Sequence, residues 1–158
     1  MDIQSALKHQ YHAALKTLRL AVEQCPPAAW DQADGNCAPF WRVAYHTLFF
    51  THFYLQQDRS QLKPWEKHRR GVEGLGNPGA TPYSRDEILE YWRICDGMID
   101  AGIDKLDLSA PQCGFPWYKM PTLEHQLVNI RHIQHHAAML AARLRSLADI
   151  SIDWVGRA

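Results

Sequence analysis

Two histidines near the C-terminus, His132 and His136, have the spacing of a metal-binding pair. They occupy positions i and i+4 of a segment with helical periodicity, so their side chains lie one turn apart on the same face of a helix. Neutral imidazole is the commonest protein ligand for zinc, nickel and similar ions. Two ligands rarely hold an ion tightly, so a third ligand is expected elsewhere in the chain.

The best candidate for the third ligand is His46. It lies within the segment 39–57, which is apolar nearly all round and predicts a helix buried on several sides. His52, in the same segment, projects about 120° away from His46 and is not expected to join the site. The residues that share a face with His46 are apolar and mostly aromatic: Val43, Phe49, Phe50 and Phe53.

Together, His46, His132 and His136 predict a site for one divalent ion. Three protein ligands leave one or two positions for water or substrate, which is typical of a catalytic metal. The cation would lower the pKa of a bound water or hold a substrate thiol as thiolate. Asn129, one turn before His132, is predicted to orient a ligand or to contact substrate. The alternative is that these are ordinary histidines, hydrogen-bonded at helix contacts.

Helix geometry places other histidines away from this site. His135 falls almost opposite the apolar stripe of its segment and is expected to face water. His9 and His12 lie opposite the apolar stripe of the first helical segment, where we expect them to be solvated and to bind nothing.

Hydrophobic periodicity predicts four helices, over 2–24, 39–57, 84–106 and 122–148. The third opens with the capping-box residues Ser84 and Glu87, and Thr122 is predicted to cap the fourth. No strand pattern is present. We therefore predict an all-α fold, a single-domain four-helix bundle over 1–158 with a long crossover connection between its second and third helices.

Two connections are candidates for walls of the site. The crossover over 58–83 is rich in proline and glycine, and a connection of this length is usually a crossover, a lid or a site wall. The shorter connection carries Phe115, Trp117 and Tyr118 and leads directly into the segment with His132. These aromatic side chains either pack on the bundle or form a wall over the metal.

Composition excludes several functional classes. Lysine plus arginine and aspartate plus glutamate both number 17 in the 158 residues, which gives no net field for nucleic acid or for an acidic membrane. No signal peptide and no apolar run of about 20 residues is present. The four cysteines form no C-x-x-C pair, so we expect reduced thiols in a cytoplasmic protein. Glu-x-x-His repeats and a Gly-x-Ser-x-Gly elbow, which would indicate a di-iron site or a serine hydrolase, are also missing.

The combination of His46 in the second helix with His132-x-x-x-His136 in the last resembles the DinB-like (YfiT-like) metal-binding four-helix bundles. This resemblance implies helices in up-down-down-up order, often a homodimer, and a three-histidine site for zinc, nickel or a similar ion. Its members include transferases that use low-molecular-weight thiols, a thiol-dependent maleylpyruvate isomerase and proteins described as metal-dependent hydrolases. The presence of His52 after His46 departs from the pattern of the family.

These observations lead to one functional hypothesis and one alternative. The hypothesis is a metal-dependent thiol transferase or hydrolase that acts on a small molecule, with no nucleic-acid or membrane partner. The alternative is a non-catalytic ligand-binding or stress-response bundle with a structural metal. Thermal melting with and without a chelator distinguishes them, because a structural ion contributes a large part of the stability.

Overall fold

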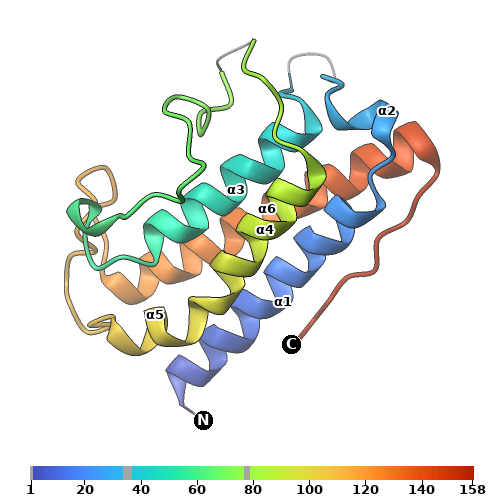
Figure 1. Ribbon diagram of the computed structural model, residues 1–158. Helices are drawn as coiled ribbons and strands as arrows, with labels where there is room; N and C mark the ends of the chain where they lie inside the picture. The colour runs from blue at the N-terminus through green and yellow to red at the C-terminus, as the bar shows by residue number, and fades with distance from the viewer. Residues whose placement is uncertain (1, 34–36, 77–78) are drawn as a thin grey trace.

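Every regular element is a helix in the computed structural model, which describes residues 2–33, 37–76 and 79–158 (Figure 1). The predicted all-α class is therefore confirmed. The four long helices are α1 (Ile3–Gln24), α3 (Phe40–Tyr54), α4 (Arg85–Gly97) and α6 (Thr122–Ala148). Three shorter elements connect them: α2 (Pro27–Trp30), the 3-10 helix η1 (Arg59–Gln61) and α5 (Ile99–Lys105).

Local sequence signals explain most helix starts. The predicted capping box is present, since the Ser84 hydroxyl accepts from the backbone of Glu87 and the Glu87 carboxylate accepts from the backbone of Ser84. The prediction that Thr122 caps α6 is wrong. Pro121 occupies the N-cap position without a side-chain hydrogen bond, and the Thr122 hydroxyl is 3.5 Å from the Gln112 carbonyl oxygen. The capping preference of threonine is overridden here by a tertiary contact.

The third predicted helix is two helices. The segment predicted as one helix over 84–106 breaks at Met98, between α4 and α5. Gly97 directly precedes the break, and glycine has a low helix propensity. The apolar stripe nevertheless continues through both helices, because Cys95, Ile99 and Ile103 are all fully buried.

Contacts along α3 and α6 show that these helices are antiparallel. The backbone carbonyl of Tyr54, at the end of α3, accepts from Gln126 near the start of α6 at 3.0 Å. His46, about two turns nearer the N-terminus of α3, contacts His132, which is nearer the C-terminus of α6 than Gln126. Any site between the two helices therefore combines residues from the middle of each.

The remaining directions follow from contacts of α4. Trp92 donates to the Leu15 carbonyl at 2.8 Å and Asp96 meets His12 at 2.7 Å, so α1 and α4 are antiparallel. The ring of Tyr91 faces a residue of α3, Tyr45, and Cys95 faces one a turn later, Leu48, so α3 and α4 are parallel. The helices therefore run up-down-down-up, as the family resemblance implies.

The parallel pair requires the long crossover. Because α3 and α4 point the same way, the connection over 58–83 must return along α3, whose 15 residues span about 22 Å. Figure 1 shows the described part of this connection running beside α3. The Arg42 guanidinium donates to the Gly74 carbonyl at 2.7 Å, and the Tyr45 hydroxyl is hydrogen-bonded to His68 at 2.6 Å. The described part of the connection is therefore packed on α3.

The core lies between the four long helices. All of them contribute fully buried apolar side chains, and each such side chain stabilises the fold by about 1.5–3 kcal/mol relative to exposure. The central members are Leu15, Leu18, Tyr45, Leu48, Ile88, Ile133 and Leu140. In the described parts of the chain, none of the helices is both long and apolar enough to cross a membrane.

Candidate metal centre

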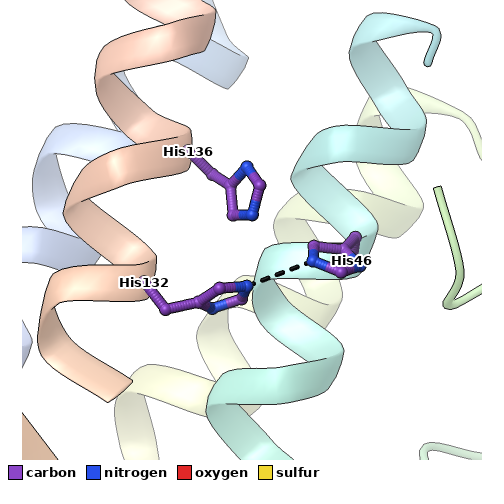
Figure 2. A group of neighbouring side chains, drawn as sticks. All are labelled: His46, His132 and His136. Atoms are coloured by element: carbon purple, nitrogen blue, oxygen red, sulfur yellow. Dashed lines mark hydrogen bonds between the residues drawn. The ribbon is translucent and has the colours of Figure 1, made fainter. Parts of the chain in front are cut away.

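The structure brings together the three histidines singled out from the sequence. His46 projects from α3 toward His132 and His136 on α6 (Figure 2). Their ligand nitrogens all lie within 4.8 Å of one another, and the Nε2 atoms of His46 and His132 are 3.1 Å apart. Two nitrogens bound to one tetrahedral zinc ion, each at about 2.0–2.1 Å, lie about 3.3 Å apart. The His46–His132 pair therefore has the spacing of two ligands of one ion, and the three side chains together could hold a divalent ion.

The orientation of His46 is fixed by the crossover connection. Its Nδ1 atom is 2.7 Å from the backbone carbonyl oxygen of Glu73. A carbonyl oxygen only accepts, so Nδ1 carries the proton and Nε2 presents its lone pair toward His132. The Phe50 ring, 4.7 Å from the imidazole, packs against His46. Sequence analysis did not identify Glu73, because every residue has a backbone carbonyl and nothing in its residue type signals this role.

The other two imidazoles, of His132 and His136, both project from α6 and contact each other. Their i, i+4 spacing places the ring centroids of His132 and His136 4.6 Å apart. The Nδ1 atoms of both rings are buried and have no hydrogen-bond partner within the described residues. No side-chain carboxylate or cysteine of the described residues belongs to the cluster. The donor set is therefore three imidazoles, which suits zinc, nickel and related ions.

Burial keeps these imidazoles neutral, the state in which imidazole binds a metal. Burial, with the neighbouring His136 and His46, lowers the pKa of His132 to about 3. Burial, with His46 and His135, lowers the pKa of His136 to about 4. Burial also lowers the pKa of His46, although its hydrogen bond to the Glu73 carbonyl acts in the opposite direction. All three imidazoles are therefore uncharged at neutral pH, as metal ligands must be.

Asn129 links α6 to α3 by a hydrogen bond. It is fully buried, and its Nδ2 atom donates to the Thr51 carbonyl at 3.3 Å. Its Oδ1 atom has no partner among the residues that the structure describes. The observed bond joins α6 to α3 one turn from His132, so the position of Asn129 suits a group that orients the helix carrying the ligands.

The remaining histidines lie outside the cluster. His52 points to the Tyr91 hydroxyl at 3.2 Å, and His135 is exposed, as predicted for both. His68, whose position was not predicted, stacks on Phe49. The prediction for His12 is wrong, because its ring is only partly exposed.

His12 contacts two carboxylates on the neighbouring helices. Its Nδ1 atom is 2.7 Å from the Asp96 carboxylate, and its Nε2 atom is 3.4 Å from that of Asp100. Periodicity placed His12 off the apolar face of α1, but that position borders α4 and α5 rather than open water.

An aromatic wall extends from the cluster along α3. Phe50 is followed by Phe53, with ring centroids 6.3 Å apart, and Phe53 is 6.2 Å from Trp117 in the last connection. An open groove of about 550 Å³ along α6 is lined by Tyr118 and His132, among others. The aromatic residues Phe115 and Trp117 of the last connection thus pack on α3, and Tyr118 shares a groove with His132.

A family model for the DinB superfamily matches residues 10–140 of the chain. The chain belongs to the DinB superfamily. The matched region includes all three clustered histidines, the whole of α3 and residues 122–140 of α6. The chain matches no curated protein and no solved structure.

Proposed function

We propose that this member of the DinB superfamily binds one divalent ion, zinc or nickel, through His46, His132 and His136. We further propose that the ion activates a thiol or a water for reaction with a small-molecule electrophile, which makes the protein a thiol transferase or a hydrolase. The observation that carries the proposal is the convergence of three neutral imidazoles from two helices, with their nitrogens within 4.8 Å of one another.

The charge of the ligand set favours an activating ion. Three neutral imidazoles leave the full double positive charge on the cation. A cation in this state binds an anionic fourth ligand strongly, so it lowers the pKa of a bound water or thiol. A thiolate held in this way remains a nucleophile, whereas the free thiol is largely protonated at neutral pH.

The coordination number favours catalysis over a structural role. A structural zinc site is closed by four protein ligands. Within the described residues, no fourth histidine, cysteine or carboxylate joins the trio. The open groove lined by His132 is proposed as the route by which a small molecule reaches the remaining position. Asn129 is proposed to orient the ligand-bearing helix by holding α6 against α3, through its bond to the Thr51 carbonyl.

Cellular setting and assembly are proposed on separate grounds. The described cysteines Cys25, Cys37, Cys95 and Cys113 are all free thiols, which supports the proposed cytoplasmic location. Homodimerisation is proposed from the family resemblance, and light scattering after size-exclusion chromatography tests it.

Cobalt substitution tests the proposed chemistry directly. Cobalt(II) takes the same ligands as zinc, and unlike zinc it absorbs visible light. A bond from a thiolate sulfur to cobalt adds a charge-transfer band in the near ultraviolet. Adding a low-molecular-weight thiol to the cobalt-loaded protein should produce this band, and adding an electrophile should remove it as product forms. The matched control is His135→Ala, which should behave as wild type because His135 is exposed. A cobalt spectrum that thiols do not change would refute the transferase, and hydrolysis of ester and amide panels would then test the hydrolase.

A further inference from the structure

Arg42 connects the crossover to the metal-binding trio. It lies one turn before His46 on α3 and is 2% exposed. Its Nε atom donates to the Gly74 carbonyl at 2.7 Å and its Nη2 atom to the Gly71 carbonyl at 3.2 Å. Between these two acceptors lies Glu73, whose carbonyl accepts from His46 at 2.7 Å. The same short backbone segment, 71–74, is therefore held by the arginine and in turn holds the histidine.

We infer that Arg42 is a positioning residue for the metal site: it fixes the backbone of 71–74 so that the Glu73 carbonyl selects the tautomer of His46 whose Nε2 can bind the ion. This inference rests on the proposed function and extends it to a residue that does not touch the ion.

The physical basis of the inference is the choice between two tautomers. A neutral imidazole carries its proton on Nδ1 or on Nε2, and a protonated Nε2 cannot bind a metal. The Glu73 carbonyl favours the proton on Nδ1 only while it stays within hydrogen-bonding distance. Hydrogen bonds from a charged guanidinium are stronger than those between neutral groups, and the planar fork of arginine reaches two carbonyls at once. Loss of Arg42 releases the segment, so His46 populates the tautomer that cannot bind metal.

A second anchor indicates that the crossover is held specifically along this part of α3. The Tyr45 hydroxyl is hydrogen-bonded to His68 at 2.6 Å, which fixes the crossover a few residues before 71–74. Arg42, Tyr45 and His46 share one face of α3. Removal of Arg42 alone should therefore loosen 71–74 without detaching the whole crossover.

The chain offers a matched control in Arg143. This arginine on α6 is 6% exposed and donates to two loop carbonyls, those of Ala38 at 2.8 Å and Gln32 at 2.6 Å. None of these contacts involves a residue that holds a clustered histidine. Arg42→Met and Arg143→Met therefore each remove buried bonds to loop carbonyls, but only the first removes a bond linked to the proposed metal site.

The experiment measures zinc affinity by competition with a chromogenic chelator in wild type, Arg42→Met and Arg143→Met. Loss of a partner that orients a metal ligand typically weakens affinity by about 10–100-fold, and this loss is expected for Arg42→Met. For Arg143→Met the affinity should stay within about twofold of wild type, although both variants melt at lower temperature. If Arg42→Met does not fold, Arg42→Lys, which keeps one charged donor, should show a smaller loss in the same direction.

The tautomer provides a readout that general destabilisation does not change. In ¹⁵N spectra of the metal-free protein, His46 should carry its proton on Nδ1 in wild type and in Arg143→Met, and should show a mixture in the Arg42 variants. Wild-type zinc affinity together with an unchanged tautomer in the Arg42 variants would overturn the positioning role and leave the proposed function intact. Failure of wild type itself to bind zinc, nickel or cobalt would instead refute the proposed function.

Discussion

The same residue type occurs in two opposite electrostatic settings in this protein. Between α3 and α6, His132 lies among imidazoles and aromatic rings, and burial lowers its pKa to about 3. Between α1 and α4, burial acts against the charged form of His12, but the hydrogen bonds and charges of Asp96 and Asp100 raise its pKa above the usual value. One site therefore favours a free lone pair, whereas the other favours a positive charge.

The difference shows that the groups around a histidine determine its pKa, and with it whether the imidazole suits metal binding or an ion pair. A carboxylate beside an imidazole stabilises the proton that a metal would have to displace. No carboxylate oxygen of the described residues belongs to the histidine cluster, whereas His12 has two carboxylates within hydrogen-bonding distance. The groups that contact a histidine therefore matter as much as the histidine itself.

The largest expected effect comes from removing a proposed ligand. His132→Ala should lower zinc affinity by more than about 100-fold, because it removes a direct ligand and so exceeds the loss caused by an orienting partner. Elemental analysis of the purified variant should show less than stoichiometric metal, while circular dichroism stays helical. His135→Ala is the control, since it removes an exposed imidazole from the same helix. Equal metal content in the two variants would show that His132 is not a metal ligand.

Zinc should also stabilise the wild-type fold. An ion that binds only the folded state contributes about 2.7 kcal/mol at a free concentration 100 times its dissociation constant, and this raises the melting temperature by roughly 5–10 °C. His12→Ala should show the same shift as wild type, because His12 lies in the other setting. A shift that persists in His132→Ala would place the stabilising ion elsewhere.

A smaller effect is expected at His12, and it depends on pH. Because the folded-state pKa of His12 is raised, its ion pair stabilises the fold fully below the pKa of the unfolded chain, which is near 6.5. This contribution is lost as the pH rises through the folded value. His12→Ala should therefore lower the free energy of unfolding by about 0.5–1 kcal/mol in mild acid and by less in mild base.

Urea unfolding across the pH range measures this effect. His9→Ala is the control for His12→Ala, since no ion pair of His9 is found in the described parts of α1 and its neighbours. A cost of His12→Ala that grows as the pH rises would contradict the assignment of His12 as a charged partner.

The smallest effect separates the two carboxylates. Asp96 is 2.7 Å from His12 and its side chain is 29% exposed, whereas Asp100 is 3.4 Å away and 68% exposed. Solvent screens the second pair more strongly. Asp96→Asn should therefore lower the pKa of His12 more than Asp100→Asn does, as measured by NMR titration. Equal decreases would show that exposure does not distinguish the pairs.

The sequence predicts the fold and the trio because both depend on helical periodicity. The faces of His46, His132 and His136 follow from counting residues along two long helices, and the structure brings these three together. The break at Met98 was missed because the apolar stripe continues across it. The position of His12 was missed because periodicity identifies the face of a helix but not the elements packed against that face.

The contacts of the crossover could not be predicted for a different reason. The bonds from Arg42 and His46 end on backbone carbonyls of Gly71, Glu73 and Gly74, and backbone groups are the same in every residue. Their positions depend on the path of an irregular connection, which no periodic pattern specifies. The backbone contacts that orient His46 in the proposed metal site can therefore be identified only from the three-dimensional structure.

The antiparallel pairing of α3 with α6 brings together two proposed ligands, His46 and His132, that are 86 positions apart in sequence. An ion bound by both residues would be a reversible cross-link that closes a long loop of the chain, as a disulfide does in an oxidising compartment. A protease that nicked the crossover would leave two fragments packed together through the core between the four long helices, with the cation as one further link that a chelator removes.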